Sequence, residues 1–467
     1  MSIAEIGLIG LGTMGSALAL NIAEKGFPIA VWNRTGSVTT AFHVEAGALA
    51  DKITPTQSLE ELVAAIAEPR AIILMVPAGQ PVDDQIDALR KLLGPNDMII
   101  DAGNANFHDT NRRSKAAGDL PFLGIGVSGG EEGARHGPAI MGGGKREHWD
   151  RVSHILEAIS AKFGDTPCAD WMGEAGAGHF VKAVHNGIEY ADMQMIAEIY
   201  GILRDGRGMR ADDIGEAFER WNRGTLKSYL IEISGKVARA VDPETNRPML
   251  DMIVDAAGQK GTGRWTVIEA QHLGAPIPAI EAAVFARNVS ARRAERAMGE
   301  ELFGPASRPI ADGAVWDELL EKAMIAGKVL CYAQGFAMIE AASVEFGWNL
   351  NLPAIARVWR EGCIIRSAML DDMASALTED PSRNLMFAPY FADHLKRGQG
   401  ALRDIVAICA RHGMPAPALA SGLFYFDAMR TGRGTANMIQ AQRDFFGLHG
   451  FVRTDNGASD QHGPWAP

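Results

Sequence analysis

Five polar side chains recur at helical spacing in the stretch that follows Gly178. They stand at positions i, i+3, i+4, i+7 and i+8, which a helix places on one face: Lys182, His185, Asn186, Glu189 and Tyr190. A lysine and a glutamate on one face can share the roles of general base and general acid. The alternative is a solvated stripe, for which Gly187 would cost about 1 kcal/mol without benefit. The spacing therefore favours a catalytic face.

A glycine-rich motif opens the chain. The short apolar run from Ile6 to Ile9 leads into Gly10, Gly12 and Gly15 in a GxGxxG pattern, followed by an Ala- and Leu-rich stretch. In a strand–turn–helix unit the first glycine permits the tight turn, the second lets a pyrophosphate approach the backbone, and the third lets the helix lie close to the strand. The motif predicts dinucleotide binding, the alternative being an incidental glycine-rich turn.

The coenzyme preference depends on the end of the second expected strand, Ile29 to Trp32. An enzyme that uses NAD normally has an acid there for the ribose 2′-hydroxyl. This chain has Asn33, Arg34 and Thr35 instead. An arginine suits a 2′-phosphate, and the two neutral residues add hydrogen bonds without repulsion. The sequence thus predicts NADP, unless Arg34 is an ordinary surface arginine.

Two further polar turns could hold an anion. The first, Ser128-Gly129-Gly130, follows an apolar run and would lie beyond the carboxyl end of a strand, where open α/β sheets bind ligands. The second, residues 258–263, is glycine-rich and carries Lys260 and a threonine, a composition suited to a phosphate. It does not match the Walker pattern, so it does not predict an ATP site. Either segment could alternatively be only a tight turn.

The texture of the chain changes twice, and these changes predict three regions. Residues 1–176 alternate short β-like runs with helical stretches; the runs are Ile6–Ile9, Ile29–Trp32, Ala71–Val76, Met98–Ile100 and Phe122–Val127. Residues 177–430 carry helical spacing, as in 178–203 and 316–346. In residues 431–467 the periodicity fades. We expect an α/β Rossmann domain, a large all-α domain and an extended C-terminal tail.

The helical region contains a weak internal repeat. Tyr190 begins a stretch that leads to Trp221 and Ser228, and a similar stretch leads from Tyr332 to Trp359 and Ser367. The match could be chance. If real, it predicts a duplicated helical unit.

Composition bounds the partners. The chain has 467 residues, with 45 Lys and Arg against 57 Asp and Glu, and its formal charge of −12 argues against nucleic-acid or anionic-membrane binding. The four cysteines are widely spaced and show no metal-binding pattern, so we expect free thiols, no metal and a reducing compartment. No apolar run reaches membrane-spanning length and no secretory signal is recognisable, which predicts a cytoplasmic protein.

With these residues assembled, the chain resembles the 6-phosphogluconate dehydrogenase family over essentially its whole length. Further stretches carry the resemblance besides the motifs above: 78–84, 99–104, 127–135, 182–190, 258–265 and 442–449. The family implies a homodimer whose C-terminal tail reaches into the partner subunit. It also implies oxidation and decarboxylation of 6-phosphogluconate to ribulose 5-phosphate and CO2, with NADP as the coenzyme.

The resemblance assigns roles by position. For NADP it implies Gly10, Leu11, Gly12, Thr13, Met14, Gly15, Asn33, Arg34, Thr35, Val76, Pro77, Ala78 and Asn104. For the substrate it implies Asn104, Ser128, Gly129, Gly130, His185, Asn186, Tyr190, Lys260 and Arg287, with Arg443 and His449 from the partner subunit. It makes Lys182 the general base and Glu189 the acid that protonates the enediol.

The chain departs from the family pattern at Pro77, where a lysine is common. Two alternatives stay open at this point. A β-hydroxyacid dehydrogenase shares the Rossmann start, the Ser-Gly-Gly turn and the helical lysine, but lacks the Lys260 loop and the tail. A catalytically dead NADP-binding regulator would be expected to have lost Lys182 or Glu189, and this chain has both.

Overall fold

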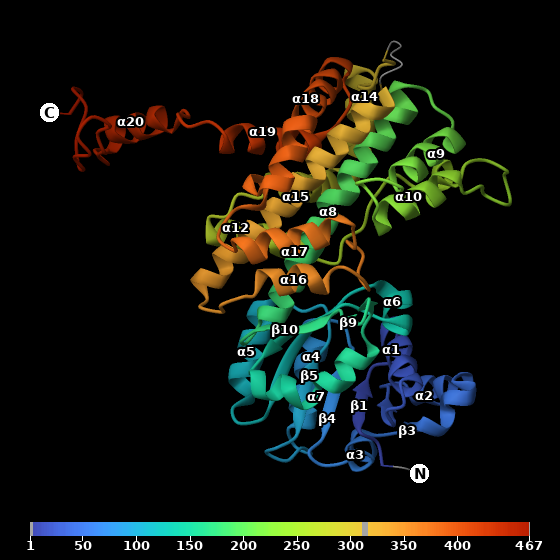
Figure 1. Ribbon diagram of the computed structural model, residues 1–467. Coiled ribbons are helices and arrows are strands. Elements are labelled where there is room, and N and C mark those ends of the chain that lie inside the picture. Colours follow the sequence, from blue (N-terminus) through green and yellow to red (C-terminus); the bar gives the residue numbers. More distant parts are fainter. Residues whose placement is uncertain (1–2, 311–315, 467) are drawn as a thin grey trace.

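Figure 1 shows the computed structural model, which describes residues 3–310 and 316–466. A sheet with helices on both faces forms one body, a larger helical body lies beside it, and the C-terminal segment stands away from both (Figure 1). Among the helices of the described ranges, none is both long enough and apolar enough to cross a bilayer.

The N-terminal body is built on an eight-stranded sheet with the strand order β10-β7-β6-β5-β4-β1-β2-β3. Its strands are β1 (Ile6–Ile9), β2 (Ile29–Trp32), β3 (Ile53–Pro55), β4 (Ala71–Leu74), β5 (Met98–Asp101), β6 (Phe122–Val127), β7 (Ile140–Gly144) and β10 (Ala169–Gly173). All neighbouring pairs are parallel except β6 with β7. The chain reverses its winding between β1 and β4, and in such sheets this reversal opens the dinucleotide crevice.

Helices cover both faces of this sheet. They are α1 (Thr13–Glu24), α2 (Gly36–Glu45), α3 (Leu59–Ala64), α4 (Gln80–Leu89), α5 (Phe107–Ala117), α6 (Gly130–His136) and α7 (Arg146–Ile159). The strands alternate their side chains between two apolar clusters. Ile6 and Leu8 join the cluster that contains α1 and α7, whereas Ile9 joins the one that contains α3 and α4. Burial on both faces explains why these strands read as continuous apolar runs. A short hairpin, β8 (Lys162–Phe163) and β9 (Thr166–Pro167), precedes β10.

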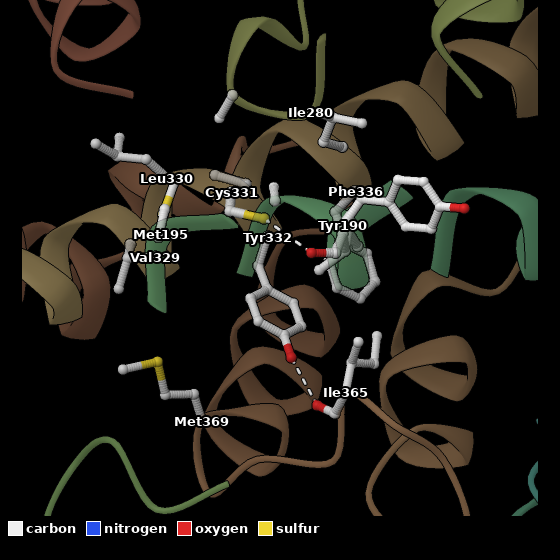
Figure 2. Close-up of a cluster of buried hydrophobic side chains, with 14 of the residues drawn as sticks. Tyr190, Met195, Ile280, Val329, Leu330, Cys331, Tyr332, Phe336, Ile365 and Met369 are labelled. Atoms are coloured by element: carbon white, nitrogen blue, oxygen red, sulfur yellow. Dashed lines mark hydrogen bonds between the residues drawn. The ribbon is translucent and has the colours of Figure 1, made fainter. Parts of the chain in front are cut away.

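The second body is helical. Its elements are α8 (Ala177–Gly201), a π-helical turn (Ile202–Gly206), α9 (Ala211–Trp221), α10 (Tyr229–Arg239), α11 (Met249–Met252), α12 (Thr262–Leu273), α13 (Pro278–Ser290), α14 (Arg293–Phe303), α15 (Trp316–Glu345), α16 (Leu352–Val358), α17 (Met369–Glu379), α18 (Pro389–His412) and α19 (Pro417–Met429). The long helices α8 and α15 lie against each other at its centre. Figure 2 shows this core, in which the Tyr332 hydroxyl donates to the Ile365 carbonyl at 2.7 Å and the Cys331 thiol contacts the Ile188 carbonyl.

A buried ion pair joins the two central helices. Lys328 on α15 donates to Asp192 on α8, and both side chains are fully buried. The segments beyond these helices also meet, because Ser228 and Ser367 form an isolated antiparallel bridge. These two serines close the two halves of the weak sequence repeat, so their pairing is what a duplicated unit related by a local two-fold axis would produce.

The tail forms a helix, α20 (Ala436–Gly447), and a loop folded back on it. Asp444 organises this arm by accepting hydrogen bonds from the backbone of Gly450 and Gly463 and from the side chains of His462 and Trp465. The sequence analysis did not predict this helix, although four apolar residues share one of its faces and are exposed within one chain: Met438, Ile439, Phe445 and Phe446. The expected strand 71–76 ends earlier, at Leu74, and 98–100 extends to Asp101.

Replacing Lys328 by methionine should lower the thermal unfolding midpoint strongly. Asp192 would remain buried without its partner, a loss that typically costs about 3–5 kcal/mol. The double variant Lys328→Met/Asp192→Leu should recover most of the midpoint because it leaves no unpaired charge. An equal loss in the single and double variants would contradict this account.

Candidate active site

The polar face of α8 lies against the carboxyl end of β6. A side chain at Gly126 would meet the Lys182 Cβ at 2.4 Å, so the missing side chain in the strand is what lets the helix approach. Lys182 is 8% exposed to solvent, Tyr190 is 6% exposed and His185 is fully buried. This burial excludes the solvated stripe. Asn186 and Glu189 are half-buried, so the five residues form a largely buried polar face.

A ring of hydrogen bonds surrounds the Lys182 amine. Its Nζ donates to Asn186 Oδ1 at 2.7 Å and to Ser128 Oγ at 3.1 Å. The Ser128 hydroxyl lies 3.3 Å from His185 Nε2. His185 Nδ1 lies 2.9 Å from Asn186 Oδ1, the amide oxygen that also accepts from Lys182. Because that amide oxygen can only accept, we assign the His185 proton to Nδ1, which leaves Nε2 to accept from Ser128. Asn186 is itself fixed by donating to Thr262 Oγ1 at 3.0 Å.

This ring of hydrogen bonds determines which side of the amine stays open to a ligand. A neutral lysine has two N–H groups, and Ser128 and Asn186 accept both. The His185 Nδ1–H donates to Asn186 at 2.9 Å and lies 3.5 Å from Nζ, so the lone pair of a neutral amine is left for a ligand. Within the described residues no carboxylate oxygen lies within ion-pair distance of Lys182, whose partners there are neutral groups.

Burial shifts the ionisation of this face in the directions that acid–base chemistry needs. It lowers the pKa of Lys182, although Glu189 opposes the shift. Burial also lowers the pKa of His185 well below its usual range, with a further contribution from Lys182, so this imidazole stays neutral. The pKa of Glu189 is raised by burial against the attraction of Lys182 and Arg287. The pKa of the amine thus moves in the direction that a base requires, and the pKa of the carboxyl in the direction that an acid requires.

The turn after β6 borders this face. Gly129 and Gly130 have φ values of +106° and +64°, which glycine adopts without strain, and α6 begins there. A side chain on Gly129 would meet the Gly362 carbonyl oxygen at 2.6 Å. The segment after α16 therefore closes on the Ser-Gly-Gly turn, while Trp359 stacks edge-on against His185 at 5.6 Å between ring centroids.

The loop 258–263 and α13 lie at the Tyr190 end of the face. The Arg287 guanidinium sits 3.4 Å from the centroid of the Tyr190 ring and donates to the Gly258 carbonyl at 3.1 Å. A side chain at Gly263 would meet the Tyr190 ring at 2.5 Å. Lys260 is exposed, and within the described ranges its ammonium has no hydrogen-bond or ion-pair partner. The Arg287 cation thus lies against Tyr190, beside the loop that carries Lys260.

The glycine motif has the geometry expected of a dinucleotide loop. Gly10 has a φ of +100°, and a side chain on Gly15 would strike the Gly10 carbonyl at 1.8 Å. At Gly12 an added side chain would meet no atom within 4 Å, so the backbone there is open to a ligand. The α1 helix starts at Thr13 and no side chain caps it, which leaves N–H groups for an anion. The remaining motif residues, Leu11 and Met14, lie in the same turn and first helical turn.

The other residues expected to contact the coenzyme lie along the same edge of the sheet. Asn33 accepts from the Leu11 amide at 3.1 Å, so it connects the end of β2 to the glycine loop. Arg34 and Thr35 are exposed, and in the part of the chain that the structure describes the Arg34 guanidinium has no partner. The loops after β4 and β5 carry the other predicted contacts, Val76, Pro77, Ala78 and Asn104.

Sequence reasoning missed the residue that holds these two loops. Arg113 is buried and donates to the Gly79 carbonyl at 2.9 Å, to Asp101 at 3.3 Å and to Asp83 at 2.9 Å. It therefore fixes the segments that lead to Ala78 and Asn104. No local motif could have identified Arg113, because its partners are 12 to 34 residues away in the sequence. Thr262 was likewise noted only as part of a loop.

Two predicted site residues do not join the site within one chain. Arg443 and His449 lie on the tail, are exposed, and belong to the arm that stands away from the rest of the molecule (Figure 1). The Arg443 guanidinium contacts only Gln440 of the same helix among the described residues. Their role stays a prediction that requires a second subunit.

Comparison with protein families gives two matches that together cover most of the chain. Residues 5–173 match the model described as the NAD binding domain of 6-phosphogluconate dehydrogenase. Residues 178–465 match that of the 6-phosphogluconate dehydrogenase C-terminal domain.

Individual relatives agree. The NADP(+)-dependent, decarboxylating 6-phosphogluconate dehydrogenase of Bacillus subtilis is 46% identical over 462 residues, or 97% of this chain and 98% of the relative. The NAD(+)-dependent enzyme of the same organism is 45% identical over 97% of both chains. A structure of Plasmodium falciparum 6-phosphogluconate dehydrogenase, described in apo form and with NADP+ and 6-phosphogluconate, covers 99% of this chain and 100% of its own with a TM-score of 0.94 at 39% identity. The chain belongs to the 6-phosphogluconate dehydrogenase family.

Proposed function

We propose that this protein oxidises and decarboxylates 6-phosphogluconate to ribulose 5-phosphate and CO2 with NADP as the coenzyme. The observation that carries the proposal is the buried Lys182 amine, whose contacts among the described residues are Ser128, His185 and Asn186, with no carboxylate at ion-pair distance. The membership of the chain in the family supports the same reaction. An assay of NADP reduction by 6-phosphogluconate, with trapping of CO2, tests it directly.

The residues at the sheet edge fit a dinucleotide. The open backbone at Gly12 and the uncapped α1 would hold the pyrophosphate, and exposed Arg34 would hold a 2′-phosphate. Asn33, Thr35, the 76–78 loop and Asn104 would complete the contacts. When bound, NADP supplies the hydride acceptor. The B. subtilis relatives differ in coenzyme at nearly equal identity to this chain, so local residues such as Arg34 must decide the preference.

Lys182 would act twice. As a neutral amine it takes the proton of the substrate 3-hydroxyl while the C3 hydride leaves, which gives a 3-keto acid. Its ammonium form then donates a hydrogen bond to the 3-carbonyl. This bond stabilises the negative charge that develops on oxygen as CO2 departs and the C1–C2 electron pair becomes the C2–C3 double bond. Lys182 then passes its proton to that oxygen, which gives the enediol. Ser128, His185 and Asn186 keep the amine in position throughout.

Glu189 would finish the reaction. Its raised pKa favours the protonated carboxyl, which can deliver a proton to the carbon that lost CO2. Lys182 takes back the enediol hydroxyl proton as the ketone of the product forms. The two groups stand seven residues apart on one helical face, so one helix presents an acid and a base to the same substrate.

The substrate phosphate would lie at the Tyr190 end. Arg287, Lys260 and Tyr190 supply two cations and a hydroxyl there, and Ser128, Gly129, Gly130 and Asn104 would contact the sugar-acid portion. In this arrangement residues 1–176 bind the coenzyme and residues 177–430 bind the substrate and form the dimer.

The tail, residues 431–467, would complete the site of the other subunit in a homodimer. Phe445 and Phe446 are 70% and 72% exposed on an arm that stands away from its own chain, which supports docking on a second copy. Arg443 would then reach the phosphate of the substrate bound in the partner subunit, and His449 would contact the same substrate. The four cysteines are free, which supports a cytoplasmic location.

Replacing Lys182 by methionine should lower kcat for oxidation and decarboxylation by about 10²–10⁴-fold, because the general base is lost. Glu189→Gln should instead preserve NADPH formation in a single turnover while slowing release of the ketone.

In the unmodified protein, kcat/KM should rise as the pH passes upward through the lowered pKa of Lys182, since only the neutral amine accepts a proton. The control for Lys182→Met is Lys322→Met, which removes an exposed lysine. A near-normal kcat in Lys182→Met would refute the assigned role.

Arg34→Ala should lower kcat/KM for NADP by roughly 10–100-fold, the effect of losing charged hydrogen bonds to a 2′-phosphate. The value for NAD should change little and serves as the internal control. The outcome that would contradict the assignment is an equal fall with both coenzymes, or a preference of the unmodified protein for NAD.

The shared site can be tested by complementation. A chain truncated before Gln442 should be inactive as a homodimer, and so should full-length Lys182→Met. Coexpressed, they should form heterodimers with one working site, in which the truncated chain supplies Lys182 and the Lys182→Met chain supplies the tail. Recovered kcat should approach half that of the unmodified dimer per heterodimer. Full activity of the truncated homodimer, or no recovery in the isolated heterodimer, would argue against tail exchange.

A further inference from the structure

A second polar cluster lies outside the site described above, in a pocket at the joint between the two bodies. The pocket is bordered by the start of α5 and by one face of α12, and its apolar wall includes Phe180, Val184 and Trp265. Three side chains with metal-ligating atoms meet at it: His108, Glu269 and His272.

The geometry of the three side chains is compact. His108 Nε2 lies 2.8 Å from Glu269 Oε2, and His272 Nδ1 lies 3.5 Å from the same oxygen. All three ligand atoms lie within 4.8 Å of one another. In a tetrahedral site with bonds of about 2.0–2.2 Å, ligand atoms are roughly 3.3–3.5 Å apart. Small rotations would therefore bring the three atoms to ligating distances, and the two imidazoles can rotate because their side chains are 55% and 66% exposed.

The carboxylate is what makes this cluster unusual. The Glu269 side chain is only 6% exposed, yet among the described residues its ion-pair partners are two imidazoles and no lysine or arginine. A carboxylate removed from water requires a compensating cation. A metal ion held between the two imidazoles and the carboxylate would supply one.

We infer that His108, Glu269 and His272 bind one divalent ion of the zinc class. Two imidazole nitrogens and one carboxylate oxygen suit Zn²⁺ and its borderline neighbours, while Mg²⁺ and Ca²⁺ prefer sets made of oxygen. Glu269 and His272 stand at i and i+3 on α12, so one helical face presents both. Three protein ligands leave a fourth position for water. This metal site is separate from the proposed catalytic residues, and metal binding would be a function in addition to the proposed reaction.

The ligands come from different bodies, so the ion would act as a clamp. His108 lies on α5 in the coenzyme-binding body, four positions after Asn104, whereas the other two ligands lie on α12 of the helical body. Helix α12 begins at Thr262, which holds Asn186 in the hydrogen-bond ring. Metal binding would therefore fix the loop that carries Asn104 relative to the helix that supports Asn186.

The sequence predicted no metal site. The three residues show no compact binding pattern, because His108 and Glu269 are 161 positions apart. Only the docking of the two bodies brings them together.

The test is titration calorimetry with Zn²⁺ on the full-length, metal-free protein, prepared without a histidine tag. We expect saturable binding of one ion per chain and little binding of Mg²⁺ or Ca²⁺. His108→Ala and His272→Ala should each weaken Zn²⁺ binding by at least about 100-fold, since each removes a ligand. Zn²⁺ should also raise the thermal unfolding midpoint of the unmodified protein and not that of the variants.

His154→Ala is the matched control. His154 forms a similar pair with Glu5 at 3.0 Å and is equally exposed, but among the described residues Glu5 is its only hydrogen-bond or ion-pair partner, so its loss should leave Zn²⁺ affinity unchanged. Because all three histidines are exposed, the variants should fold, which their unfolding midpoints without metal verify. Absence of saturable binding, or equal affinity in all variants, would overturn the proposal. Loss of binding in His272→Ala but not in His108→Ala would overturn the clamp.

Discussion

The proposed site depends on one constraint: the Lys182 amine must be buried and must have only neutral partners. An ion pair within hydrogen-bond distance would hold Lys182 protonated and end its use as a base. The protein instead surrounds the amine with a hydroxyl, an amide oxygen and a neutral imidazole, which position it without a full opposing charge. Burial then lowers its pKa, and the same burial raises that of Glu189 on the next turns of the helix. A single physical condition thus prepares both the base and the acid.

That condition requires both bodies. The coenzyme-binding body supplies Ser128 and a strand that has glycine where α8 approaches. The helical body supplies α8 and, through α16 and the segment after it, the Trp359 ring and the Gly362 carbonyl that close the site from the other side. Neither body alone would exclude water from the amine. The domain joint is therefore where the proposed chemistry would take place, and the His108, Glu269 and His272 cluster lies on the same joint.

The helical body also shows how a large domain can be built around one site. The central helices α8 and α15 are fixed by the buried pair of Lys328 and Asp192, and the segments beyond them meet at Ser228 and Ser367. An ion pair of this kind contributes less to stability than to uniqueness, because misplacing either helix would leave a buried charge unpaired. The site needs that precision, since its hydrogen bonds span α8, α12 and β6.

The sequence by itself determined the parts of the protein whose signals are local. Strands buried on both faces read as apolar runs, the GxGxxG turn needs glycine for steric reasons, and a helical face is fixed by spacing, so Ile6–Ile9, Gly10 to Gly15 and the Lys182 stripe were all predictable. The tertiary structure alone decided what depends on contacts between distant segments. It fixed which neutral groups surround Lys182, that Arg113 holds the loops after β4 and β5, and that His108 meets Glu269. It also showed that the tail forms a helix, whose apolar side chains stay exposed within one chain. Desolvation and close approach are properties of assembled surfaces, and no spacing along one segment encodes them.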